Sequence, residues 1–241
     1  MSQKNKKVRI AAVGDIHFVM SKTEETKNLI TRASKLADII LLCGDITNYG
    51  QEEEAVEIAK IFNTVQIPIL AVLGNHDHAE EKPKQIKKIL NEARVHFLED
   101  AVFVYENLGF AGVKGFGGGF NKNMIASFGE TATKKFVEES INETLMLERF
   151  LQSLTTPKII VALHYAPIIE TVVGEPEQIM PFLGNSRLSE TLDRFNVRAV
   201  FHGHAHHGSL KGKTQKGIAV YNCSLPLLLK HGQKGFILHE E

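Results

Sequence analysis

Five short apolar stretches of the chain are each followed at once by side chains that can bind a metal ion or carry a proton. These side chains are Asp15 and His17, Asp45, Asn75 and His76, His164, and His204 and His206. Parallel strands of an open sheet end at the same edge, and ligands bind at that edge. Residues two positions apart on an extended backbone also point to the same side. The sequence therefore predicts one polar cluster assembled from five separate segments.

The donors in this cluster are imidazole nitrogens, carboxylate oxygens and one amide. The seven candidate metal ligands are Asp15, His17, Asp45, Asn75, His164, His204 and His206. Seven donors are too many for one ion and suit two ions if one carboxylate bridges them. Imidazole with carboxylate favours divalent or trivalent Mn, Fe or Zn over Mg or Ca. Two such ions about 3.5–4 Å apart form a clamp for in-line displacement at phosphorus, so the residues predict metal-assisted hydrolysis.

The elements that position these residues can be predicted from apolar runs and helical periodicity. The runs predict buried strands at 8–13, 39–43, 67–73, 159–163 and 198–201. Amphipathic patterns predict helices at 23–36, 51–62, 84–93, 134–154 and 188–195. The alternation of strand and helix as far as residue 93 indicates a parallel sheet covered by helices. Short strands and turns over 96–119, with closing strands at 218–221 and 235–238, indicate a second, partly antiparallel sheet.

The long helix predicted at 134–154 has an apolar side. That side contains Val137, Ile141, Leu145, Phe150, Leu151 and Leu154. No repeat or low-complexity linker interrupts the chain, so we expect residues 1–241 to form a single domain with two sheets and outer helices. At 241 residues the chain is long enough to bury a sizeable core without disulfides.

Composition excludes several classes of protein. Hydrophobic residues are 43% and charged residues 23% of the chain, which is typical of a globular protein. Lys and Arg equal Asp and Glu at 28 each, so no overall charge draws the chain to nucleic acid or an anionic membrane. Cys43 and Cys223 lie among apolar residues, which predicts buried thiols rather than a redox pair.

Targeting signals are also missing from the sequence pattern. The basic residues within 4–9 precede an apolar stretch, 10–13, that is too short for a signal peptide. No apolar run approaches the length of a membrane span. We therefore expect a cytoplasmic protein with no membrane partner, whose partner is a small phosphate-ester substrate.

Taken in order, the motifs resemble those of the calcineurin-like metallophosphoesterase superfamily. The motifs are Asp15-x-His17, Gly44-Asp45, Gly74-Asn75-His76-Asp77, His164 and Gly203-His204-x-His206. Each motif alone is weak, but five in this order are specific, and they span nearly the whole chain. The resemblance implies an α/β fold of the α+β kind, a four-layer αββα sandwich with two mixed β-sheets flanked by helices.

The resemblance also implies what each residue does. One metal ion would be held by Asp15, His17, Asp45 and His206. The second would share Asp45 and add Asn75, His164 and His204. A hydroxide bridging the two ions would attack phosphorus in line. His76, which is not a ligand, would act as the general acid or stabilise the transition state.

The resemblance is greater to some branches of the superfamily than to others. Serine/threonine protein phosphatases carry an acidic residue and an arginine where this chain has Asn48 and Tyr49, and a glycine where it has Phe18. The size of the chain and its motifs are more similar to small bacterial and archaeal phosphoesterases related to class III cyclic-nucleotide phosphodiesterases. We therefore expect a small phosphodiester or phosphomonoester substrate.

Five further residues are candidates for supporting roles. Asn48 is expected to orient His76 by a hydrogen bond, and Asp77 to orient a neighbouring group or cap a helix. Gly118 belongs to a glycine run, 115–119, that forms either a phosphate or nucleobase cradle or a turn. Arg187 is a candidate for holding a substrate anion, and His207 for lining the site.

Two other functions stay open at this stage. A nuclease would need electrostatic and stacking contacts to a polymer, and a net charge of zero with 7% aromatic residues weakens both. A non-catalytic interaction module on the same fold would be expected to have lost ligands, whereas His76, His204 and His206 are all present. The sequence does not specify an oligomeric state.

Overall fold

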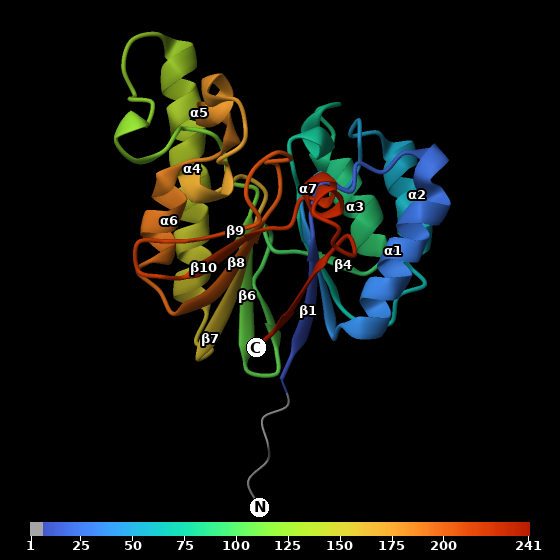
Figure 1. Ribbon diagram of the computed structural model, residues 1–241. Coiled ribbons are helices and arrows are strands. Elements are labelled where there is room, and N and C mark those ends of the chain that lie inside the picture. The colour runs from blue at the N-terminus through green and yellow to red at the C-terminus, as the bar shows by residue number, and fades with distance from the viewer. Residues whose placement is uncertain (1–6) are drawn as a thin grey trace, which may run out of the picture.

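The computed structural model describes residues 7–241, so Lys4 and Lys6 lie outside the described residues. One sheet carries the first three metal-site segments (Figure 1). Its strands are β1 (Arg9–Val13), β2 (Ile39–Cys43), β3 (Ile69–Val72), β4 (Val95–Phe97) and β11 (Ile237–Glu240), in the order β11-β1-β2-β3-β4. β1 to β4 run parallel, and β11 pairs antiparallel with β1.

The second sheet carries the last two metal-site segments. Its strands are β5 (Phe103–Tyr105), β6 (Leu108–Val113), β7 (Lys158–Leu163), β8 (Val197–His202), β10 (Ala219–Asn222) and β9 (Lys211–Lys213), in that order. The four central strands are parallel, while β5 and β9 are antiparallel at the edges. Both sheets are therefore mixed.

Helices cover the outer faces of the two sheets (Figure 1). The first sheet is covered by α1 (Thr23–Leu36), α2 (Glu52–Phe62) and α3 (Pro83–Glu92). The second is covered by α4 (Thr131–Ser153) and α6 (Ser186–Leu192). Two short helices, α5 (Met180–Leu183) and α7 (Leu225–Lys230), lie near the edge where the metal-site segments emerge.

The stacking of the layers follows from the alternation of side chains along each strand. On β1, Ile10 and Ala12 pack into the core between the sheets, whereas Ala11 and Val13 pack against the helices. A strand buried on both faces must be apolar at every position, which explains the unbroken apolar runs. The expected fold class, two mixed sheets flanked by helices, is confirmed.

The long helix was predicted at nearly the right place, and Val137, Phe150, Leu151 and Leu154 pack inward as expected, but two residues of the predicted apolar side do not. In α4, Ile141 and Leu145 are 38% and 43% exposed. The buried positions include the polar residues Ser140, Glu143 and Thr144. Glu143 faces inward because it accepts the N–H of Gly115 and pairs with the buried ammonium group of Lys114. Apolar periodicity alone does not reveal such a polar contact.

Candidate active site

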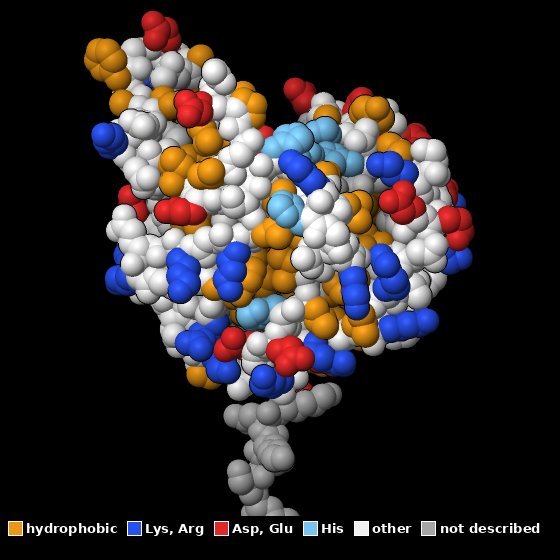
Figure 2. All heavy atoms as spheres, viewed as in Figure 1, with side chains coloured by type: hydrophobic (Ala, Val, Ile, Leu, Met, Phe, Trp, Pro, Cys, Tyr) orange, Lys and Arg blue, Asp and Glu red, His pale blue; other side chains and the backbone are white. Residues whose placement is uncertain are grey.

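The five predicted segments meet at one edge of the sandwich. Three overlapping groups of side chains each bring their ligand atoms within 4.8 Å of one another. The groups are Asp15, His17 and His206; His17, Asp45 and His76; and Asp45, His164 and His204. Asn75 joins them, because its Oδ1 lies 2.9 Å from Nε2 of His164. Figure 2 shows histidine side chains gathered in the hollow at the top of the molecule, between its two halves.

Four of the candidate ligands hold an unusual backbone conformation. The φ angles of Asp15, His17, Asp45 and His204 are +56°, +46°, +50° and +68°. Residues other than glycine rarely adopt this left-handed region, and such strain gathers at functional sites.

Two glycines of the motifs are explained by close approach. A Cβ on Gly74 would lie 2.1 Å from Oδ1 of Asp45, and a Cβ on Gly203 would lie 2.3 Å from Oδ2 of Asp15. Any larger residue would push a candidate ligand out of place. The glycines in these motifs thus make room for carboxylates that come from another strand.

Hydrogen bonds fix which nitrogen of two histidines is free to bind a metal. Nδ1 of His164 donates to the carbonyl of Cys43 at 3.0 Å, which leaves Nε2 as the free nitrogen. Nε2 of His204 donates to the carbonyl of Phe182 at 3.2 Å, which leaves Nδ1. Burial lowers the pKa of both rings, so both are neutral, as metal ligands must be.

Asp15 and His206 form a charge-assisted pair. Nε2 of His206 donates to Oδ1 of Asp15 at 3.0 Å. Burial opposes the charge on Asp15, but this hydrogen bond and the nearby imidazoles outweigh it and lower the carboxyl pKa to about 2. Burial likewise opposes the charge on His206, and the bond to Asp15 outweighs it and raises the imidazole pKa. Asp15 is therefore an anion throughout the neutral range.

The surroundings of Asp45 shift its carboxyl pKa in the opposite direction from that of Asp15. Burial, followed by the negative charges of Asp15 and Asp77, raises the pKa of its carboxyl group to about 9. Its Oδ1 accepts the N–H of His76 at 2.8 Å, and its oxygens lie 3.5 Å from His164 and 3.7 Å from His17. A nearby cation would lower the pKa of this carboxyl group, so that Asp45 would lose its proton.

The donor set fits metal ions. Nδ1 of His17 is buried without a hydrogen-bond partner among the described residues, and its Nε2 lies 3.5 Å from Nε2 of His206. Burial lowers the pKa of His17 to about 4, so the ring is neutral. Neutral imidazoles and buried carboxylates that converge in this way suit the divalent or trivalent ions expected from the sequence.

His76 is placed beside the candidate ligands and held by the main chain. Its Nδ1 donates to the carbonyl oxygen of Asn48 at 2.6 Å, and its ring lies 4.4 Å from that of His17 between centroids. Residue 48 therefore orients His76, as expected, but through its backbone and not through its amide side chain. The nitrogen that faces away from this bond is Nε2.

Asp77 fastens two of the loops to each other. Its carboxylate is fully buried and accepts the N–H groups of Gly74, Ile46 and Thr47 at 2.8, 3.2 and 2.8 Å, and the Thr47 hydroxyl at 2.7 Å. The loop after β2 carries Asp45, and the loop after β3 carries Asn75 and His76. Through these hydrogen bonds Asp77 orients the two loops, which agrees with the expectation that it orients a neighbouring group.

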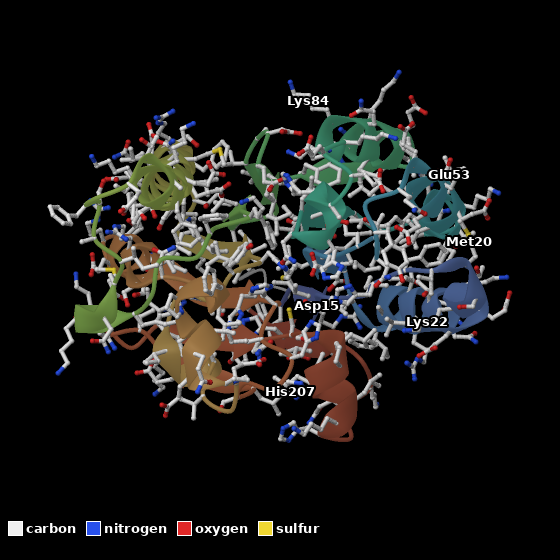
Figure 3. All side chains as sticks on the ribbon, turned by 90° about the horizontal axis from the view of Figure 1, so that it is seen from above. Asp15, Met20, Lys22, Glu53, Lys84 and His207 are labelled. Carbon is white, nitrogen blue, oxygen red and sulfur yellow. The ribbon has the colours of Figure 1, made fainter. Side chains whose placement is uncertain are left out.

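The structure places the other three supporting candidates away from the metal-binding groups. Gly118 donates its N–H to the carbonyl of Pro181, and Arg187 packs beside Gly118 in the groove between α4 and α6. The N–H of Gly118 is thus used within the protein and is not free to cradle a phosphate. The His207 ring is exposed, and Figure 3 shows it well outside the position of Asp15, toward α7.

Sequence reasoning missed an aromatic wall beside the candidate ligands. The ring of Tyr165 lies 4.4 Å from that of His204 and 5.7 Å from Phe116, which in turn contacts Phe136. The position of Tyr165, directly after His164, was the available signal. Phe182 closes the wall and supplies the carbonyl that orients His204.

Comparison with known sequences agrees with this geometry. The profile of the calcineurin-like phosphoesterases matches residues 8–208, which include every candidate metal ligand. The chain belongs to the calcineurin-like phosphoesterase family. Members of this family are metal-dependent hydrolases of phosphoester bonds, and the expected family is confirmed. The match ends before α7 and β11.

Two curated relatives are about a quarter identical to the chain over the aligned residues. An uncharacterized protein of Methanocaldococcus jannaschii is 26% identical over 63% of the chain and 62% of its own length. A probable glycerophosphodiester phosphodiesterase of Arcobacter nitrofigilis is 25% identical over 71% of the chain and 58% of its own length. The chain thus spans about three fifths of the length of these relatives.

Solved structures share the fold at low sequence identity. The phosphopantetheinyl hydrolase of Mycobacterium tuberculosis superimposes with a TM-score of 0.72 at 10% identity, covering 97% of this chain and 96% of that one. A protein of Thermus thermophilus gives 0.59 at 17% identity, covering 98% and 99%. Within residues 7–241, no helix is long and apolar enough to cross a membrane.

Proposed function

We propose that this protein is a binuclear metal-dependent phosphoesterase that hydrolyses a small phosphodiester or phosphomonoester. The observation that carries the proposal is the overlap of the three ligand groups, which share His17 and Asp45. Because Asp45 belongs to groups on both sides of the cluster, its carboxylate is positioned to bridge two ions. This is also the residue whose carboxyl pKa is raised to about 9 by burial and by neighbouring carboxylates.

The chain offers one set of donors for each ion. The first set is Asp15, His17, Asp45 and His206, and the second is Asp45, Asn75, His164 and His204. When bound, two such ions supply a nucleophile at neutral pH and neutralise charge that develops on the phosphate. Mn, Fe and Zn all suit these donors, and cellular supply decides among them.

His76 is the proposed general acid. The carbonyl of Asn48 accepts a hydrogen bond from Nδ1, so the proton that can be given to a leaving oxygen is carried on Nε2. The backbone N–H of His76 also donates to Asp45, which ties the position of this ring to that of the bridging carboxylate. Proton donation and metal binding are thus built into one loop.

The relatives bear on the kind of substrate and leave the choice open. One curated relative is named as a probable glycerophosphodiester phosphodiesterase, and one structural relative as a phosphopantetheinyl hydrolase. Both names refer to organic phosphate esters and neither refers to a nucleic acid, which supports a substrate other than a nucleic acid polymer. We further propose that residues 1–241 act as one domain and that the protein is cytoplasmic, which subcellular fractionation of the source cells would test.

The first experiment is a paired substrate test on purified protein that has been stripped of metal and reloaded with Mn²⁺. One arm uses bis(p-nitrophenyl) phosphate and the other p-nitrophenyl phosphate. We expect metal-dependent release of p-nitrophenolate, and the ratio of the two rates separates a diesterase from a monoesterase. Turnover that does not depend on metal would contradict the proposal.

Two variants separate metal binding from proton donation. Asp45→Ala should lose bound metal and all turnover, because both ligand sets include this carboxylate. His76→Ala should keep its metal content while kcat falls about 10²–10⁴-fold, the usual contribution of a general acid. Metal analysis of both proteins checks the assignment, and loss of metal from His76→Ala would show that His76 is a ligand.

A further inference from the structure

A groove of about 280 Å³ leads away from the candidate metal ligands between α1 and α7. Two candidate metal ligands, Asp15 and His17, are among the residues that line it, so the groove borders the metal site. Figure 3 shows Asp15 near the middle of the molecule, with Lys22 to one side at the start of α1. The volume is at the lower end of the range for small-molecule sites and suits one arm of a substrate.

Part of the groove wall is apolar. Leu29 projects from α1, and Leu225, Pro226 and Leu229 project from α7. Leu29 is buried, whereas Leu229 is 51% exposed although it is a large apolar side chain. Gly235 closes the groove, and a Cβ there would lie 2.8 Å from Leu29, so the wall is tightly packed at this point.

Two cationic side chains, Lys22 and Arg32, line the groove along α1. Lys22 lies near the metal-site end, where its positive charge acts on His17. Arg32 follows ten residues later, roughly 15 Å along the helix, and its Nη2 donates to the carbonyl of Lys234. Glu25 lies between them, and no ion pair within 4.0 Å joins it to either cation among residues 7–241. The carboxylates of Asp15 and Glu25 equal Lys22 and Arg32 in number, so the positive charge of the lining is local to these two side chains.

We propose that this groove binds the ester arm that stays on the phosphate, and that the preferred arm is an apolar chain ending in an anionic group. The apolar chain would lie against the leucines of α1 and α7, and its terminal carboxylate or phosphate would meet Arg32, whose planar fork suits such oxyanions. This inference rests on the proposed phosphoesterase function and names the class of substrate for it.

We assign the groove to the ester arm that stays on the phosphate, and not to the leaving group, because of the position of His76. His76 is the proposed proton donor to the leaving oxygen; it is hydrogen-bonded to the carbonyl of residue 48, and its ring contacts that of His17. It does not line the groove. The leaving group is therefore directed toward His76, and the groove is left for the other arm of a diester.

Three synthetic diesters test the proposal with a constant leaving group. All release p-nitrophenolate, and their second arms are methyl, octyl and 7-carboxyheptyl. Since remote binding raises kcat/KM without changing the chemistry, we expect kcat/KM at least about tenfold higher for octyl than for methyl, and several-fold higher again for carboxyheptyl. Equal kcat/KM values for the three diesters would overturn the groove assignment.

Matched variants assign the effect to the groove. Arg32→Ala should remove the preference for the carboxylate and keep the preference for octyl, whereas Lys35→Ala, an exposed cation farther along α1, should change neither. Leu229→Trp should fill the groove and remove both preferences, so that kcat/KM becomes the same for the three diesters. Leu36→Trp is its control, because Leu36 is an exposed leucine of α1 outside the groove.

Direct binding separates failure of the groove from failure of the function. Calorimetry would compare methylphosphonate, octylphosphonate and 8-phosphonooctanoate, on Mn²⁺-loaded protein and again after chelation. We expect the last compound to bind most tightly, and Arg32→Ala to weaken it about tenfold. Binding without any hydrolysis of the methyl diester would support the groove and contradict the phosphoesterase. Hydrolysis of the methyl diester without tighter binding of either long phosphonate would support the phosphoesterase and contradict the groove.

Discussion

At the scale of single residues, Asp45 shows how the site is held ready for cations. Its carboxyl group is buried beside those of Asp15 and Asp77, and its pKa is raised to about 9. Without a cation, the folded protein holds a proton on Asp45 at neutral pH, whereas the unfolded chain does not. Metal binding must therefore displace this proton, and metal affinity should rise with pH.

The first prediction concerns the pH dependence of metal-free protein. A carboxyl pKa raised from 3.8 to about 9 means that folding stability is present in full below pH 3.8 and is lost as pH rises toward 9. We expect the Tm of chelator-treated protein to fall between pH 5 and 8. Asp45→Asn should flatten this part of the curve, because an amide still accepts the N–H of His76 but does not titrate.

Thermal unfolding of both proteins across this range provides the measurement. His76→Ala serves as the control, since it keeps the carboxyl group of Asp45 and should keep the slope. A slope that is the same in Asp45→Asn and in the unmodified protein would show that another group is responsible.

Residue types and spacing were enough to predict which side chains meet at the site. They were not enough to predict how His76 is oriented, because its partner is a main-chain carbonyl and every residue has one. Nor did they reveal the left-handed backbone of Asp15, His17, Asp45 and His204, which depends on how the loops cross over the strand ends. The same spacing is compatible with relaxed loops.

At the scale of elements, Asp77 joins the loop after β2 to the loop after β3. It accepts four hydrogen bonds from those loops and is fully buried. Buried donors that lose their partner carry a penalty of about 1–3 kcal/mol each. The separation between Asp45 and His76 is therefore held by a side chain that is not itself among the candidate metal ligands.

The second prediction is the effect of removing this side chain. Asp77→Ala should lower the free energy of unfolding by roughly 3 kcal/mol and weaken metal binding, because both loops lose their common anchor. Asp77→Asn keeps one carbonyl oxygen as an acceptor and should fall between Asp77→Ala and the unmodified protein. Denaturant unfolding and metal titration of the three proteins check this order. Metal affinity that is unchanged in Asp77→Ala would contradict the anchoring role.

Most helices and strands lie where apolar runs and periodicity predict them, and the exceptions share a physical cause. The prediction placed Ile141 and Leu145 on the buried face of α4, but Glu143 turns inward to Gly115 and Lys114 instead. The short helix α7 was missed because Leu225–Lys230 is too brief to show a period. Both features depend on neighbours that are distant in the sequence.

At the scale of the whole molecule, most of the apolar core lies in strands and helices, outside the ligand loops. Three apolar clusters fill the spaces between the sheets and under each helical layer. Burial of this amount of apolar surface dominates folding. The fold should therefore persist when the ions are removed, unlike small domains that unfold without their metal.

The third prediction follows from this separation. Chelation should abolish turnover, leave the far-ultraviolet circular dichroism unchanged, and lower Tm by roughly 10 °C, since ligand present at about a thousand times its Kd contributes about 4 kcal/mol. Added Mn²⁺ should restore both Tm and activity. A disordered spectrum after chelation would contradict the proposed independence of the core.

The sequence pattern alone predicted a parallel sheet, a second sheet and outer helices. The stacking of the two sheets into four layers came from the resemblance of the motifs, because alternating apolar residues do not reveal which sheet they face. The apolar pattern also did not predict the strand order at the edges of the sheets. For example, β11 lies beside β1, although the two strands come from opposite ends of the chain. The groove between α1 and α7 depends on that same long-range pairing.

The pairing of β11 with β1 has a consequence for synthesis on the ribosome. Gly14, directly before Asp15, is held on one side by the carbonyl of Cys223 and on the other by the N–H of Leu225. Its strand, β1, emerges first, but those partners and β11 emerge about two hundred residues later. The nascent chain cannot complete its first metal-site loop until then. We therefore expect partial translation products that lack residues 223–225 to leave the loop of Asp15 without these hydrogen bonds.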